Sequence, residues 1–131
     1  MGLSGLSDEC PGIKNASDKE VIGYAKGAAS SAFENIKRNQ HASRHLIDEG
    51  VLPNWNKNTA ALYKEMGISV LENPTHTFDH VLRDGNAVKG FIGQANGKTV
   101  AFMVYKSGQN QGLIATSIVP SLQQMSNWGI K

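Results

Sequence analysis

The sequence predicts an α+β fold, in which N-terminal helices pack on a small twisted antiparallel sheet and a short helix closes the chain. Apolar residues recur at helical spacing through the first half of the 131 residues, and after residue 86 the spacing changes to the alternation of strands. Helices followed by a run of strands are typical of this fold class. An apolar content of 40% provides enough material for a core without disulfides.

The composition along the chain predicts one domain after a short leader. Residues 1–16 are rich in Gly and Ser and are expected to be flexible. The single domain spans 17–131, with a helical part at 17–70 and a helix plus the antiparallel sheet at 71–131. The N-terminus lacks the basic and apolar regions of a signal peptide, and no run of 18 apolar residues could cross a membrane.

Three helices are expected in the helical part, over about 18–38, 40–48 and 53–66. Ser17 and Glu20 form a capping box at the start of the first helix, whose apolar face is rich in alanine. Pro53 opens the third helix and Gly67 is expected to end it. A short strand or a linker follows over 68–71.

The second part of the domain is predicted to contain a two-turn helix from His76 to Arg83 and then a meander. Thr75 offers an N-cap for this helix. Asn96 and Gly97 form a hairpin signal, because both residues accept positive φ. The strands are expected over 88–95, 98–106 and 113–119, with a final helix over 121–128. Along the middle strand, Val100, Phe102 and Val104 face one side, and Ala101, Met103 and Tyr105 face the other.

The charges are divided unevenly between the two halves of the chain. The whole sequence has 13 Lys and Arg against 11 Asp and Glu, a formal net charge of +2. Residues 1–84 contain all 11 acids and 9 of the basic residues, a net of −2. Residues 85–131 contain four Lys and no acid, a net of +4. This distribution favours a basic half that faces a polyanion or an acidic partner.

Several catalytic classes lack their motifs. The sequence contains no G-x-S-x-G nucleophile elbow and no Walker or Rossmann glycine pattern. Cys10 is the only cysteine, which excludes a cysteine-based zinc site and the zinc-deaminase motif. His76 and His80 have the spacing of zinc ligands, but no histidine follows them as a third ligand. A two-metal nuclease needs several carboxylates around its strands, and the strand half has none.

The densest polar cluster contains His76, His80 and Arg83. On a helix, the two histidines would share a face and Arg83 would lie one turn from His80. Metal-free cleavage of RNA needs one group to take the 2′-OH proton, another to protonate the 5′-oxygen, and donors that stabilise the phosphorane. Histidine suits the proton transfers near neutral pH. If the helix packs across the end of the sheet, these residues would converge with Lys89 and with Thr116 or Ser117.

The remaining candidates are residues that would bind RNA. Thr116 and Ser117 point to opposite faces of a strand, so at most one of them would enter a site. Tyr105 could stack on a base. The candidate cations for the RNA backbone are Lys89, Lys98 and Lys106.

A simpler interpretation of the same segment is an exposed amphipathic helix. Phe78, Val81 and Leu82 would then face inward, and the histidines would carry no chemistry. His41 and His45 repeat the same spacing earlier in the chain and are expected to be surface residues.

The closing block of the sequence carries a family resemblance. Its segments are Lys89–Gly93, Asn96–Lys106, Gln111–Ser121 and Trp128–Ile130. Over about residues 70–131 the chain resembles the C-terminal toxin domains of contact-dependent growth inhibition (CdiA) proteins and related bacterial polymorphic toxins. The plan of helices before a meander also resembles the barnase–EndoU–colicin–RelE ribonuclease group.

This resemblance implies an antibacterial toxin that cleaves RNA, often tRNA, without a metal or other cofactor. It implies that the domain is the tail of a large exported protein and acts in the cytoplasm of a neighbouring bacterium. The implied partners are RNA, a cognate immunity protein that is expected to be acidic, and for some relatives a translation factor of the target cell, with no membrane partner for the isolated domain. Thr116 or Ser117 matches the hydroxyl of the group's last strand, and Lys89 or Lys106 matches a strand cation. His76 and His80 lie where the group often places helix-borne histidines.

Two other functions remain open at this point. One is a non-catalytic module whose basic sheet binds an acidic protein or a nucleic acid. The other is a metal-dependent DNase, whose ligands would have to come from Glu65, Glu72, Asp79 and Asp84.

Overall fold

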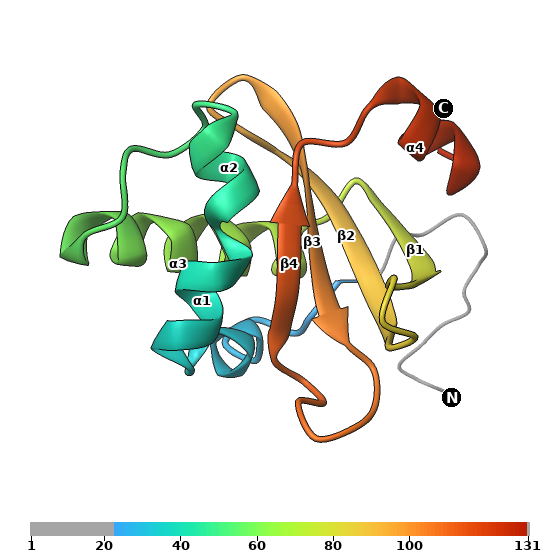
Figure 1. The fold of residues 1–131 in the computed structure, drawn as a ribbon, viewed down its shortest axis with the longest axis horizontal. Coiled ribbons are helices and arrows are strands. Elements are labelled where there is room, and N and C mark those ends of the chain that lie inside the picture. The colour runs from blue at the N-terminus through green and yellow to red at the C-terminus, as the bar shows by residue number, and fades with distance from the viewer. Residues whose placement is uncertain (1–22, 131) are drawn as a thin grey trace, which may run out of the picture.

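The computed structural model describes residues 23–130, which fold as Figure 1 shows. The expected leader at 1–16 and the capping box of Ser17 and Glu20 lie outside these residues. The described elements follow in chain order as the 3₁₀ helix η1 (Ala29–Phe33), α1 (Ile36–Ala42), α2 (Arg44–Asp48), α3 (Lys57–Glu72), β1 (His76–Val81), β2 (Ala87–Ala95), β3 (Lys98–Tyr105), β4 (Ile114–Ile118) and α4 (Leu122–Asn127).

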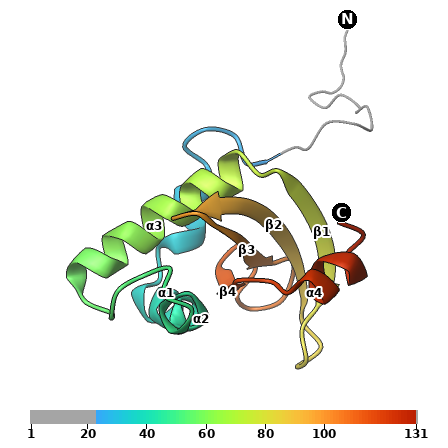
Figure 2. The same cartoon turned by 90° about the horizontal axis from the view of Figure 1, so that it is seen from above.

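The four strands form one antiparallel sheet in the order β1-β2-β3-β4, which is a meander. The helices α1 to α3 lie on one side of the sheet, and the short helix α4 lies on the other (Figure 2). This arrangement confirms the predicted α+β class. No helix among residues 23–130 combines the length and the hydropathy needed to cross a bilayer.

The two faces of the sheet carry two separate apolar clusters, as the alternation in β3 predicts. Val100, Phe102 and Val104 pack with the helices in the main core. The other face forms a minor core with α4, which includes Phe78, Val88, Ile92, Ala101, Met103, Tyr105 and Ala115. The side chains of Phe33, Tyr63 and Phe102 meet at the centre of the main core, with ring centroids 5.5–6.2 Å apart.

The turn signals of the meander are confirmed. Asn96 and Gly97 both adopt positive φ, at 52° and 80°, as the hairpin between β2 and β3 requires. The last strand ends before Pro120, and Ser121 caps α4 with a capping box that includes Gln124.

The first two predicted helices are only partly correct. Within the described residues, the expected helix over 18–38 is replaced by η1 and the start of α1. Gly27 has a φ of 87°, and Asn35 is extended and caps α1 by accepting a hydrogen bond from the Arg38 amide. The expected helix over 40–48 is divided between the end of α1 and α2.

The predicted end of the third helix at Gly67 is wrong. Helix α3 continues to Glu72, so no strand or linker occurs at 68–71. A Cβ atom at Gly67 would overlap the ring of Phe33. This glycine therefore permits close packing of η1 on α3 and does not terminate the helix. Asn56 caps the helix at its start by accepting from the Thr59 amide.

Replacing Gly67 with alanine is expected to lower the free energy of unfolding by about 1–3 kcal/mol, because the added methyl group overpacks the core against Phe33. Helix propensity alone gives the opposite sign, since alanine is favoured over glycine by about 1 kcal/mol inside a helix. Urea denaturation measures the difference. The exposed Ser69→Ala change on the same helix is the control and is expected to stay within about 0.5 kcal/mol. A more stable Gly67→Ala protein would contradict the packing explanation.

The predicted helix from His76 to Arg83 is also wrong, and the sheet has four strands where three were expected. Residues His76–Val81 form β1, which pairs antiparallel with β2 through a turn at Gly85. Phe78 lies on Gly90 of β2, where any Cβ would overlap its ring. Pairing with β2 thus outweighs the helical spacing of the histidines, and a spacing of four residues also places side chains on one face of a strand.

Candidate functional site

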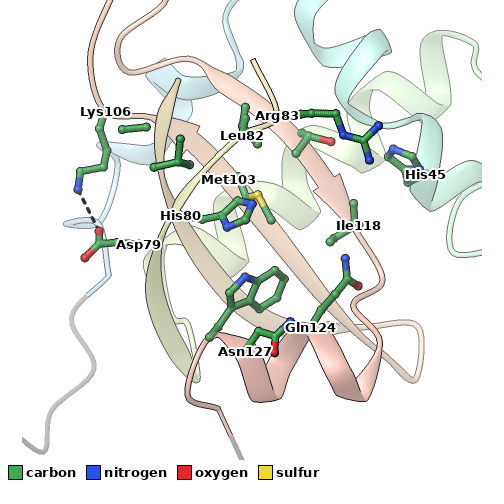
Figure 3. A pocket seen from close by; sticks show the side chains of 14 residues that line it. His45, Asp79, His80, Leu82, Arg83, Met103, Lys106, Ile118, Gln124 and Asn127 are labelled. Carbon is green, nitrogen blue, oxygen red and sulfur yellow. Dashed lines mark hydrogen bonds and ion pairs between the residues drawn. The ribbon is translucent and has the colours of Figure 1, made fainter. Parts of the chain in front are cut away.

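A cavity of about 750 Å³ opens on the face of the sheet that carries α4. Its walls come from β1 and the residues after it, from β3, β4 and α4, and from the first turn of α2 (Figure 3). The polar side chains important for the chemistry are His80, Arg83, Thr116 and His45. Three separate segments of the chain therefore supply these four polar side chains.

His80 lies in the middle of this cavity, on the same face of β1 as Phe78. Its ring meets the indole of Trp128 edge-on, with centroids 6.0 Å apart and an angle of 71°. Phe78 stacks on the same indole, with ring centroids 3.9 Å apart and an interplanar angle of 8°. Within the described residues no side chain hydrogen-bonds the His80 imidazole.

Thr116 and Ser117 point to opposite faces of β4, as expected. Thr116 is half-buried, lies beside Met103 in the β3–β4 pairing and lines the cavity. Ser117 is fully buried on the helix side. Its hydroxyl donates to the Ala42 carbonyl at 2.6 Å and accepts from the Tyr63 hydroxyl at 3.0 Å. Ser117 thus joins the helices to the sheet and does not reach the cavity.

The Tyr63 hydroxyl gives this contact a measurable pH dependence. Burial raises the pKa of Tyr63 above its ordinary value of 10.0. The stability linked to the neutral phenol is therefore present below pH 10 and is lost as the pH rises further.

Tyr63→Phe is expected to lower the free energy of unfolding by about 0.5–1.5 kcal/mol at pH 7, where it removes one hydrogen bond. Its unfolding free energy, measured with urea, should then fall less steeply above pH 10 than that of the unmodified protein. Equal slopes would contradict this assignment. Burial also raises the pKa of Tyr24, but this residue is present in both proteins and contributes equally to both slopes.

His45 is the functional candidate that the sequence analysis missed. It is exposed on α2, as expected of a surface residue, but it also lines the cavity opposite β1. Figure 3 shows the guanidinium group of Arg83 extending toward the His45 ring. The spacing of His41 and His45 carries no signal for this arrangement, because only the packing of α2 against β4 brings His45 to the cavity.

The other predicted histidine, His76, lies outside the cavity. It is exposed at the start of β1, and its Nδ1 lies 3.1 Å from the Thr75 hydroxyl. Four residues of strand separate it from His80 by about 13 Å. The two histidines therefore share a face of β1 but not a site.

Of the predicted RNA-binding residues, Lys89, Tyr105 and Lys106 border one hollow, and Lys98 lies apart from them. Lys106 lies at the rim of the cavity, where its Nζ forms an exposed ion pair with Asp79 at 3.1 Å. Lys89 lines a second hollow, of about 350 Å³, which Tyr24, Tyr105 and Lys106 also border. Lys98 lies at the β2–β3 hairpin, where its Nζ donates to the Glu49 carbonyl at 3.1 Å.

Tyr105 borders the hollow of Lys89, but most of its surface is covered. Its side chain is buried, with only 9% of the residue exposed. The guanidinium of Arg38 lies 5.6 Å from the ring centroid, and this contact is a cation–π interaction. The aromatic side chain that does line the cavity is Trp128, which had no role in the sequence-based site.

The four carboxylates considered as metal ligands do not converge. Asp79 pairs with Lys106, and Asp84 accepts from the Asn86 amide at 3.0 Å in the turn after β1. Glu72 accepts from the Gly27 amide at 2.8 Å, and Glu65 borders another hollow. Among residues 23–130, no group of three or more His, Cys, Asp or Glu side chains is placed to hold a metal ion.

Comparisons with protein-family models, with curated proteins and with solved structures give no significant match to this chain. The functional proposal therefore depends on the chemistry of the cavity and on the sequence resemblance.

Proposed function

We propose that the domain is a metal-independent endoribonuclease, with tRNA as the expected substrate. The observation that carries this proposal is the meeting of two histidines, an arginine and a threonine hydroxyl at one open cavity of about 750 Å³. The Asp79 carboxylate at its rim is held by Lys106. Positive and hydroxyl-bearing side chains in this arrangement suit a phosphodiester.

The reaction requires two proton transfers. A base removes the proton of the ribose 2′-OH, the 2′-oxygen bonds to phosphorus, and the 5′-oxygen leaves with a proton from an acid. The products are a 2′,3′-cyclic phosphate and a 5′-hydroxyl. His80 is assigned one of the two proton transfers, since it lies at the centre of the cavity and no side chain of residues 23–130 hydrogen-bonds its imidazole. His45 is the candidate for the other.

Charge stabilisation is assigned to Arg83 and Thr116. The phosphorane carries more negative charge than the starting diester, so fixed donors aimed at its oxygens lower the barrier. The guanidinium group can donate two parallel hydrogen bonds to a phosphate, and the Thr116 hydroxyl can supply another. The fixed position of Thr116 on a strand favours this role.

The biological context that we propose is an antibacterial toxin domain, delivered as the tail of an exported protein and neutralised by an immunity protein. The resemblance of residues 70–131 to CdiA-type toxin domains supports it. The excess of basic residues over 85–131 supports an acidic partner that covers the cavity.

The test is incubation of the purified protein with total tRNA in EDTA. Cleavage to fragments that end in a 2′,3′-cyclic phosphate is expected, either directly or after addition of a bacterial extract that supplies a translation factor. Intact tRNA under both conditions would refute the proposal. Salt-sensitive binding to intact RNA would instead indicate a binding module, and plasmid nicking in Mg²⁺ that a chelator blocks would indicate a metal-dependent DNase.

A further inference from the structure

Helix α4 forms one wall of the cavity beside His80, and the proposed chemistry does not use it. It contributes Gln124 and Asn127 to this wall (Figure 3), and Trp128, which follows the helix, also lines the cavity. We propose that this wall is a nucleobase-recognition subsite that selects guanine and cytosine over adenine and uracil. The inference depends on the proposed function, because it assumes that RNA enters the cavity.

Trp128 provides a rigid surface for stacking. Phe78 covers one face of the indole at 3.9 Å and 8°, and Phe78 is itself held flat on Gly90. The residue remains half-exposed and borders the cavity. An aromatic ring fixed in this way can stack on a base with little loss of conformational entropy. Since the His80 ring meets the same indole at 6.0 Å, a base bound here has its phosphodiester near the proposed proton-transfer group.

The oxygen of each amide side chain accepts one hydrogen bond from within α4 or its N-cap. The Gln124 Oε1 accepts from the Ser121 backbone amide at 2.8 Å as part of the capping box. The Asn127 Oδ1 accepts from the Gln123 Nε2 at 3.0 Å. Each oxygen thus already accepts one hydrogen bond, whereas no hydrogen bond from either NH₂ group is found within residues 23–130, so the two NH₂ groups are the freest polar groups of this wall.

Two neighbouring donors select bases that have two neighbouring acceptors. Guanine offers O6 and N7 on one edge, and cytosine offers O2 and N3. Adenine places its N6 amino donor beside N7 and N1, and the acceptors of uracil are separated by its N3–H donor. The donor pair thus matches guanine and cytosine and leaves unsatisfied groups against the other two bases.

Fluorescence of Trp128 tests the inference without any need for cleavage. The Trp55→Phe change leaves Trp128 as the single tryptophan, since the chain contains two, and Trp55 lies outside the cavity in contact with the main core. Titration with the four ribonucleoside 3′-monophosphates in EDTA is expected to quench this emission. The Kd values for GMP and CMP should be at least about fivefold lower than those for AMP and UMP. All four nucleotides carry the same charge, so the ratio of Kd values reports on the base alone.

Two isosteric variants examine the donors directly. Gln124→Glu and Asn127→Asp replace an NH₂ donor with an acceptor while one oxygen keeps the helix contact, so each is expected to abolish the preference for GMP and CMP. Ser126→Ala, on the exposed side of the same helix, is the matched control and should keep it. Circular dichroism verifies that each variant is folded.

The outcomes separate this inference from the proposed function. Equal quenching by all four nucleotides, or none, together with cleavage of tRNA would overturn the base subsite and leave the ribonuclease proposal in place. Selective quenching that the Asp and Glu variants abolish, without cleavage of tRNA, would support the subsite and overturn the ribonuclease. A preference that survives in both variants would also overturn the inference.

Discussion

His80→Ala is expected to slow the cleavage of tRNA by roughly 10²–10⁴-fold, the usual contribution of a general acid or base. The imidazole is central in the cavity and reaches it from a paired strand, so its removal deletes a proton-transfer group without disturbing the main core. The measurement is the single-turnover rate on radiolabelled tRNA, with folding verified by circular dichroism.

His76→Ala is the matched control for this experiment. It removes the same side chain from the same strand, but from an exposed position outside the cavity. Its rate is expected to remain within about twofold of the unmodified protein, since surface substitutions have small effects. If His76→Ala abolishes cleavage and His80→Ala does not, the cavity is not the active site.

Phe102→Ala is expected to lower the free energy of unfolding by about 3–5 kcal/mol. Phe102 has no exposed surface and contacts the rings of Phe33 and Tyr63 at the centre of the main core. Total stabilities of about 5–15 kcal/mol are typical of single domains, so this one change removes a large share. Denaturation in urea, followed by circular dichroism, gives the value.

The control for this variant is Leu122→Ala on α4. Leu122 is 87% exposed, so the loss of its side chain is expected to change the stability by less than about 0.5 kcal/mol. A loss below about 1 kcal/mol for Phe102→Ala would show that this residue is not central to the core.

The sequence allowed a correct prediction of the meander where local chemistry decides the structure. The hairpin at Asn96 and Gly97 follows from the need for positive φ, and the two faces of β3 follow from strict alternation. The segment with His76 and His80 was misassigned because a spacing of four residues fits one face of a helix and one face of a strand equally well. The choice between helix and strand is decided by pairing with β2, whose outer edge would have no partner without β1. This pairing is a tertiary feature that the spacing does not show.

The candidate site was predictable to a smaller extent. His80, Arg83 and Thr116 were identified from residue type and do meet at the cavity. His45 and Trp128 could not be identified, because their positions depend on how α2 and α4 pack against the edge and the face of the sheet. Gly67 shows the same limit, since a glycine required for close packing on Phe33 has the same appearance in the sequence as one that ends a helix.

The two faces of the sheet carry different apolar clusters, and only the cluster on the α4 side borders the cavity. The large aromatic rings of the main core lie under α1 to α3, away from the cavity, whereas the cavity is built on the minor core and its six-residue helix. Substitutions on α4 and at the end of β1 can therefore change what the cavity accepts while the main core continues to hold the chain folded. Under the proposed function, variation at these positions would change the RNA that is cleaved and the immunity protein that binds, at little cost in foldability.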